Sequence, residues 1–149
     1  MTITFEVPGE PKGKGRPRFQ RRGEFVHTYT PNDTASYENL VAVMYYNAVR
    51  DMKQNLKLEG PIAMDAYIYF GVPKSKSKKM QKAMLSGEVM PTIKCDIDNV
   101  VKIILDGLNK VAFDDDKQVT DLTAHKRYSD QPRVVISLKE LHERRTQDE

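Results

Sequence analysis

The residues in this chain whose types and spacing could do chemistry are aspartates that stand at both ends of one apolar segment. The stretch from Ile93 to Leu122 reads IKCDIDNVVKIILDGLNKVAFDDDKQVTDL. Asp96 and Asp98 precede the apolar residues 100–111, and three consecutive aspartates, residues 114–116, follow them. Carboxylate oxygens are the ligands that Mg²⁺ prefers in proteins, and an ion would relieve the mutual repulsion of clustered carboxylates. The pattern indicates a metal site whose platform is a buried helix.

The spacing of the first two aspartates sets a condition on where that helix begins. In extended backbone, side chains two residues apart leave the same face with Cα atoms roughly 7 Å apart, so both carboxylates could converge on one ion. In a helix the same spacing would point Asp96 and Asp98 in nearly opposite directions. We therefore expect the helix to begin at or after Asp98. For one site to form, the chain must also turn back after Val111 and bring residues 114–118 near the first pair.

The same aspartates also fit an ordinary structural interpretation. Aspartate before an apolar helix is a common N-cap, and aspartates after a helix commonly form a solvated turn. Either cluster alone favours this structural role, whereas the two clusters around one helix favour a metal site. An EF-hand calcium loop starting at Asp96 is excluded, because Val101 and Gly107 occupy the sixth and twelfth positions, where glycine and glutamate belong.

Lys102 is the lysine best placed to act with these carboxylates. It lies four residues after Asp98 and four before Asp106, so a helix that begins near Asp98 stacks the three side chains on one face. One interpretation is a ladder of helical ion pairs, each worth roughly 0.2–0.5 kcal/mol. The other is a cation directed at a phosphate, where it would stabilise developing negative charge in a transition state. The spacing leaves both interpretations open.

Composition and charge describe a soluble globular protein with a polyanionic partner. Of the 149 residues, 30% are charged and 39% hydrophobic, which is neither a disordered nor a fibrous profile, and we expect a single domain over residues 1–149. The formal net charge is only +3, but residues 12–22 and 74–82 carry many cations and no acid. No apolar run approaches the length of a signal core or membrane span, and the lone Cys95 forms no internal disulfide. We expect a cytoplasmic protein with no membrane partner.

Hydrophobic periodicity predicts an α/β (α+β) fold, with a small mixed, mainly antiparallel sheet packed with about three helices. The predicted strands are residues 3–7, 24–30, 62–70, 118–128 and 133–141, of which the last two read as an antiparallel pair joined by the turn SDQP. The predicted helices are residues 34–52, residues 75–85 and the apolar segment described above. Residues 12–22 are expected to form a loop without regular structure, and residues 142–149 a flexible tail.

Four sequence motifs follow one another in the central stretch: DIDN, a lysine three residues after that asparagine, LDGLN, and FDDDKQV. Together they resemble the RusA family of Holliday junction resolvases, which occur in bacteria and prophages. Further likeness lies in PGEPKGKGRPRF near the N-terminus, TPNDTASYEN before the first helix, and KRYSDQPRVVISL near the C-terminus, so it covers nearly the whole chain. Cys95 departs from the family pattern, because many members have proline there.

The resemblance implies a homodimeric, Mg²⁺-dependent endodeoxyribonuclease that resolves four-way DNA junctions by paired symmetrical nicks, in DNA recombination and repair. Mn²⁺ is a possible substitute for Mg²⁺. By this resemblance the metal-binding acids are Asp96, Asp98 and Asp116, with Asp115 as the usual companion of the last, and Lys102 is the functional lysine. The catalytic set is then Asp96, Asp98, Lys102 and Asp116. Because the run of aspartates has one acid more than the usual pair, Asp115 remains an alternative third ligand.

The two cationic segments would then contact the phosphate backbone. The residues concerned are Lys12, Lys14, Arg16, Arg18, Arg21, Arg22, Lys74, Lys76, Lys78 and Lys79. The three histidines, His27, His125 and His142, are scattered, and we expect no catalytic role for them. The competing hypothesis is a DNA-binding module without catalysis, in which the aspartates are only helix caps and turns.

Overall fold

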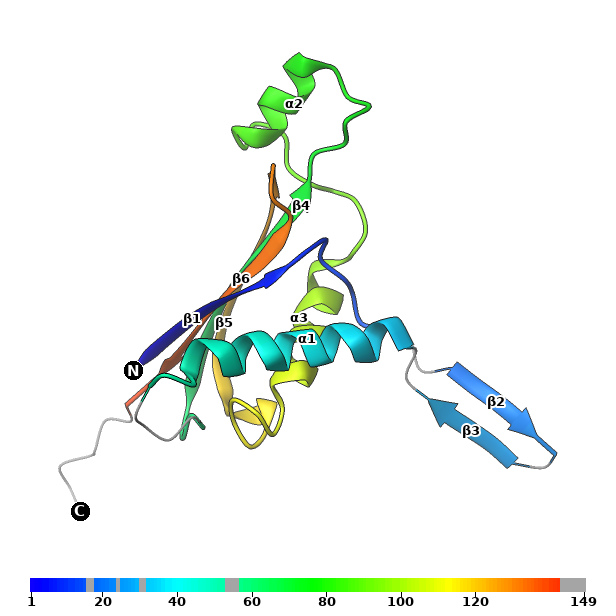
Figure 1. The fold of residues 1–149 in the computed structure, drawn as a ribbon, viewed down its shortest axis with the longest axis vertical. Helices are drawn as coiled ribbons and strands as arrows, with labels where there is room; N and C mark the ends of the chain where they lie inside the picture. The colour runs from blue at the N-terminus through cyan, green and yellow to red at the C-terminus, as the bar shows by residue number, and fades with distance from the viewer. Residues whose placement is uncertain (16–17, 24, 30–31, 53–56, 143–149) are drawn as a thin grey trace.

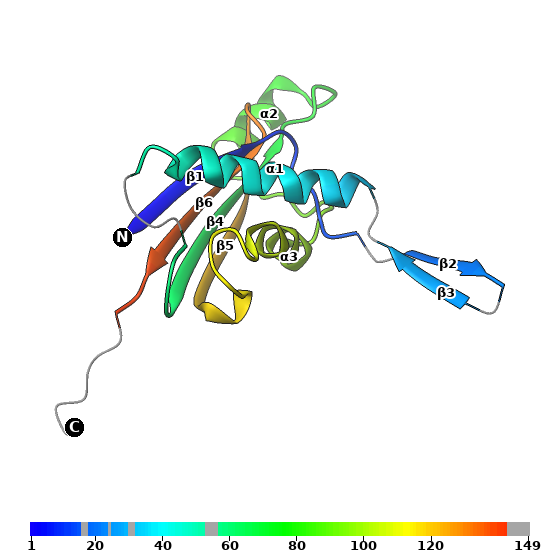
Figure 2. The ribbon, with the colours of Figure 1, turned by 60° about the horizontal axis from the view of Figure 1, so that its bottom comes forward.

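The fold is a four-stranded sheet with two helices against one of its faces (Figures 1 and 2). The computed structural model describes residues 1–15, 18–23, 25–29, 32–52 and 57–142. The strands, in spatial order, are β1 (Thr2–Pro8), β6 (Arg133–Glu140), β4 (Ile62–Gly71) and β5 (Val119–Ser129). β6 is antiparallel to both β1 and β4, whereas β5 is parallel to β4. The sheet is therefore mixed and mainly antiparallel, and the predicted α+β class is confirmed.

The core lies between this sheet and the helices α1 (Asn32–Val49) and α3 (Ile97–Leu108). In β4 every second side chain from Ile62 to Phe70 is buried, as the alternation in the sequence predicts. α1 packs over β1, where the rings of Phe5 and Tyr45 meet edge to face at 5.6 Å. α3 buries its apolar side beneath α1, and the apolar residues of that segment form the predicted core helix. Among the described residues, α1 and α3 lie on the same side of the sheet, and no helix covers its opposite face (Figure 2).

Gly107 allows α1 and α3 to approach closely. A Cβ atom at this position would lie 2.8 Å from the carbonyl oxygen of Glu38 and 2.9 Å from Cβ of Val41. We expect Gly107→Ala to lower the free energy of unfolding by roughly 1–3 kcal/mol, because the helices must separate to admit the methyl group. Denaturant unfolding measures the loss. A gain in stability, as alanine gives in an uncrowded helix, would contradict the close approach.

The structure contains the two consecutive strands that were predicted over residues 118–128 and 133–141, but their predicted pairing with each other is wrong. β5 and β6 are not hydrogen-bonded to each other, because β4 lies between them and pairs with both. Residues 130–132 span two strand spacings, roughly 10 Å, which a connection of this length can reach. A short turn between two strands therefore does not prove a hairpin when a third strand can fit between them.

The predicted loop over residues 12–22 is also partly wrong. β2 (Arg18–Arg22) pairs in antiparallel fashion with β3 (Phe25–Tyr29), the predicted strand of residues 24–30, and the two form a separate ribbon. Gly23 in the connecting turn has a positive φ of 61°, a conformation that glycine adopts without strain. The ribbon projects away from the sheet (Figure 1), and we call it the arm.

The remaining predicted elements differ from the structure mainly at their ends. α1 begins two residues before the predicted helix of residues 34–52 and ends three residues before its predicted end. The helix predicted over residues 75–85 is α2 (Lys78–Leu85), whose N-cap Ser77 accepts a hydrogen bond from the backbone N–H of Met80. Of the predicted tail, residues 143–149 lie outside the described residues. Within the described ranges, no helix is both long and apolar enough to cross a lipid bilayer.

Candidate active site

The first pair of aspartates lies at the N-terminus of α3. The helix begins at Ile97, one residue earlier than the spacing argument required, so that expectation is wrong. Asp96 is the N-cap and keeps extended backbone, with φ −63° and ψ 144°, while Asp98 is in the first helical turn. Because the helix starts between them, Asp96 is not part of the helix, and the two side chains need not point in opposite directions. Both line the same hollow in the surface.

Asp96 does not serve the helix as an N-cap usually does. Its carbonyl oxygen accepts the first hydrogen bond of the helix, from the backbone N–H of Val100, but its side chain makes no capping hydrogen bond. The carboxylate is thus not engaged in capping, while the dipole of the helix favours negative charge at this end. The structural interpretation of the first aspartate pair as caps therefore finds no support in the geometry.

The hollow beside Asp96 and Asp98 has a volume of about 540 Å³. It is also lined by residues 124–127 of β5, the edge strand of the sheet. Lys126 is held in place by a hydrogen bond from its Nζ to the carbonyl oxygen of Ile93, at 2.6 Å. The His125 ring is engaged elsewhere, because it stacks on Tyr67 and lies 3.7 Å from Asp65. Two carboxylates and the cations Lys126 and Arg127, which we call the basic wall, thus line one hollow, an arrangement suited to a cation and a phosphate together.

The sequence analysis did not consider Lys126 or Arg127, and its expectation that His125 has no catalytic role stays a prediction. Their place depends on β5 being an edge strand parallel to β4, with α3 as part of the crossover between them. The only signal in the sequence was the position of these three residues on the strand that follows the second aspartate cluster.

The three aspartates of the second cluster have different main partners, although the side chains of Asp115 and Asp116 also contact each other. Asp114 pairs with Lys57, whose hydrogen bond and charge hold the pKa of Asp114 below its usual value. Asp115 caps the short 3₁₀ helix η1 (Asp116–Gln118) by accepting a hydrogen bond from the Lys117 N–H at 2.9 Å. That backbone hydrogen bond lowers the pKa of Asp115. The structural interpretation therefore holds for Asp115, and Asp116 is the acid of the cluster turned toward α3.

Lys102 connects the second cluster to α3. Its Nζ lies 3.2 Å from Asp106 Oδ1, one turn further along the helix, and 4.0 Å from Asp116 Oδ2. The chain does turn back after Val111, since η1 packs against α3. Lys102 and Asp116 are thus brought together, whereas Asp96 and Asp98 share their hollow with β5.

The donor set fits Mg²⁺ as a two-carboxylate site. Among the residues that the structure describes, no three acidic, histidine or cysteine side chains form a group that could hold a metal ion. Mg²⁺ commonly takes only one or two protein carboxylates and completes its shell with water and phosphate oxygens. Asp96 and Asp98 would supply two such ligands in one hollow. The assignment of Asp96, Asp98, Asp115 and Asp116 as ligands stays a prediction.

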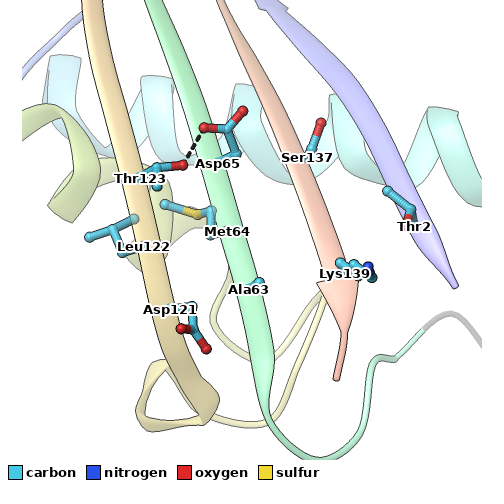
Figure 3. A pocket seen from close by; sticks show the side chains of 9 residues that line it. All are labelled: Thr2, Ala63, Met64, Asp65, Asp121, Leu122, Thr123, Ser137 and Lys139. Carbon is cyan, nitrogen blue, oxygen red and sulfur yellow. Dashed lines mark hydrogen bonds between the residues drawn. The ribbon is translucent and has the colours of Figure 1, made fainter. Parts of the chain in front are cut away.

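A second hollow, on the uncovered face of the sheet, contains none of the predicted site residues (Figure 3). Its volume is about 250 Å³. Each of its two acids is bonded to a different threonine: Asp65 accepts a hydrogen bond from Thr123, and Asp121 accepts one from Thr120 at 2.9 Å. The hollow beside α3 is therefore the better candidate for chemistry.

The predicted DNA-contacting residues have different placements. Four exposed lysines lie on the loop after β4 and in the first turn of α2: Lys74, Lys76, Lys78 and Lys79. The N-terminal end of a helix is the positive end of its dipole, so lysines in the first turn do not stabilise the helix. Their charge adds to that of the helix end, which favours a role in binding anions. Lys12 is exposed, whereas Lys14 is paired with Glu38 and Asp106. Arg16 lies outside the described residues, and Arg18, Arg21 and Arg22 are on β2, of which only the backbone is described.

Comparison with known proteins identifies the family of this chain. Residues 8–139 match the sequence profile of a family described as Endodeoxyribonuclease RusA. The chain is also 37% identical over 141 residues to the uncharacterized protein YqaN of Bacillus subtilis (strain 168), a match that covers 93% of this chain and 96% of that protein. The matched residues include those that line the hollow and both aspartate clusters. The chain therefore belongs to the RusA endodeoxyribonuclease family.

Proposed function

We propose that this protein is a Mg²⁺-dependent, structure-selective endonuclease that resolves four-way DNA junctions by paired nicks, in recombination and repair. The observation that carries the proposal is the hollow that Asp96 and Asp98 line together with the basic wall, in a chain of the RusA family. The family supplies the expectation of junction resolution, and the carboxylates supply a place for the ion. The uncapped Asp96 carboxylate distinguishes this end of α3 from an ordinary helix start.

Each residue of the site then has a physical task. Asp96 and Asp98 would hold Mg²⁺ or Mn²⁺, with Asp116 as the third acid. When bound, the ion would polarise the phosphate and lower the pKa of a water nucleophile. Lys102 would place positive charge beside the phosphate, where negative charge develops in the transition state. Lys126, fixed on the strand edge, would hold the DNA backbone across the hollow.

The elements around the hollow suggest how a branched DNA would lie. Figure 1 shows α2 and the arm projecting from the sheet in different directions, with the start of α3 between them. A backbone that contacts the exposed lysines of α2 and the arginines of the arm would pass over this region. Because one chain presents one such hollow, two symmetrical nicks require two copies, and we propose a homodimer whose two sites follow the two-fold symmetry of the junction.

Cleavage of a synthetic four-way junction tests the proposal. We expect purified protein with Mg²⁺ to cut two opposite strands at symmetrical positions, and to leave a linear duplex of the same sequences uncut. No cutting should occur with EDTA, and Mn²⁺ should restore activity.

The competing hypothesis, a DNA-binding module without catalysis, predicts a different result in the same experiment. Such a module would bind the junction without cutting it, and Mg²⁺ would not specifically raise its melting temperature. For an enzyme with two acids in one hollow, Mg²⁺ should raise the melting temperature, because the ion binds only the folded state. Binding without cutting and without this shift would refute the proposed function.

A further inference from the structure

A series of alternating charges runs from α1 to η1 across α3. Lys14 Nζ contacts Glu38 on α1 and lies 2.9 Å from Asp106 Oδ2 on α3. Lys102 Nζ lies 3.2 Å from the other carboxylate oxygen of Asp106, Oδ1, and 4.0 Å from Asp116 Oδ2. Asp106 therefore uses one oxygen for each lysine. We call these five side chains the charge series.

Lys102 is the most exposed side chain of the charge series, and the other four are partly shielded from solvent. The side chains of Asp106, Lys14 and Glu38 are 19%, 23% and 22% exposed, whereas that of Lys102 is 56% exposed. Burial alone would lower the pKa of Lys14, but its hydrogen bonds with Glu38 and Asp106 outweigh burial and raise that pKa. Lys14 thus stays charged at neutral pH, and partly shielded pairs of this kind are stronger than exposed ones.

Lys14 itself is fixed by its backbone. Its N–H donates to the carbonyl oxygen of Asn99 at 2.9 Å, and the N–H of Gly15 donates to Thr34 Oγ1 at 3.2 Å. At Gly13 an added Cβ would lie 3.0 Å from Cβ of Cys95, so the segment is pressed against the start of α3. This segment is the base of the arm. Lys14 is therefore a fixed cation that holds Asp106, rather than a side chain free to follow a phosphate.

We propose that Asp106 is a positioning residue that keeps the Lys102 ammonium beside Asp116, and that Lys14 keeps Asp106 in the orientation this requires. A long, half-exposed lysine with a single helical ion pair would sample many rotamers, because such a pair contributes only tenths of a kcal/mol. Because Lys14 holds the other oxygen of the Asp106 carboxylate, that carboxylate is a fixed partner for Lys102. The inference rests on the proposed function, in which Lys102 acts on the scissile phosphate.

Asp106→Asn tests the proposal by cleavage. We expect the single-turnover rate at saturating protein to fall about tenfold or more, which corresponds to about 1.4 kcal/mol of transition-state stabilisation. Junction affinity should stay within about twofold, because the exposed lysines of α2 are untouched. The matched control is Asp51→Asn, which removes a carboxylate from the exposed ion pair with Arg50 and should leave the rate unchanged. Equal rates for Asp106→Asn and Asp51→Asn would overturn the proposal.

A second readout does not depend on cleavage. In protein labelled with ¹³C at lysine Cε, the Lys102 resonance is the one that disappears in Lys102→Arg. We expect it to be distinct from those of free surface lysines, and to move toward them in Asp106→Asn. Lys14→Met should move it in the same direction by less, and serves if Asp106→Asn does not fold.

The two readouts separate the two ideas. A Lys102 resonance that stays in place in both Asp106→Asn and Lys14→Met would overturn the positioning role, whatever the cleavage rates. If the unsubstituted protein cuts no junction, the proposed function is wrong, and the Lys102 resonance alone decides whether Asp106 places that lysine.

Discussion

We expect Asp98→Asn to bind a four-way junction at least as tightly as the unsubstituted protein, and to cut it at least roughly a hundredfold more slowly. Asparagine keeps the size of the side chain but removes a charge from the hollow that Asp96 and Asp98 line. Without that charge the site holds Mg²⁺ more weakly, so cleavage falls. The basic wall and the lysines of α2 remain, so binding does not fall. In EDTA, binding should tighten, because one carboxylate no longer repels the phosphate.

The control for Asp98→Asn is Asp33→Asn. Asp33 also lies in the first turn of a helix, α1, so its replacement removes the same favourable interaction with a helix dipole. Both variants should lose a little stability, but only Asp98→Asn should lose cleavage. A cleavage rate near that of the unsubstituted protein would mean that Asp98 merely stabilises the start of α3, and the metal assignment would collapse.

The second large effect separates the two candidate third ligands. We expect Asp116→Asn to cut junctions at least roughly a hundredfold more slowly, because it removes the acid beside Lys102. Asp115→Asn should keep most of the cleavage activity. It should instead melt at a slightly lower temperature, because the amide oxygen of asparagine still accepts the capping hydrogen bond from the Lys117 N–H but lacks the charge that strengthens it.

Junction cleavage and thermal melting of the two variants, measured side by side, give a pair of opposite outcomes. If Asp115→Asn abolished cleavage and Asp116→Asn did not, Asp115 would be the third ligand. If neither variant slowed cleavage, the second aspartate cluster would have only a structural role, and two acids would carry the site.

Side-chain periodicity was enough to predict the faces of the main elements. The alternation from Ile62 to Phe70 predicted a strand with one buried face, and the apolar run after Asp98 predicted a buried helix. Both patterns report which side chains leave water, and burial is what the structure preserves. The neighbours of a strand are not encoded in this way, so nothing in the sequence announced that β4 separates β5 from β6.

The candidate site was likewise only partly predictable from the sequence. Residue types and spacing singled out the two aspartate clusters, because the chemistry of a metal site restricts its ligands, but the resemblance to the RusA family was needed to assign Asp96, Asp98, Asp116 and Lys102. They did not distinguish Asp115 from Asp116, since the difference is one hydrogen bond from the Lys117 N–H. Lys14 read as one cation among several in a basic loop, and only the fold places it between Glu38 and Asp106.

The pairing of β1 with β6 has a consequence for the synthesis of the protein. Thr2 pairs with Lys139, so the first strand to leave the ribosome must wait for the last before it has a hydrogen-bonded neighbour in the sheet. β4 likewise waits for both of its neighbours, which follow it by tens of residues. A nascent chain therefore carries unpaired strands until translation is nearly complete, and such strands are prone to associate with other chains. We expect fragments that lack residues 133–140 to aggregate rather than to fold, because β1 and β4 then have no antiparallel partner.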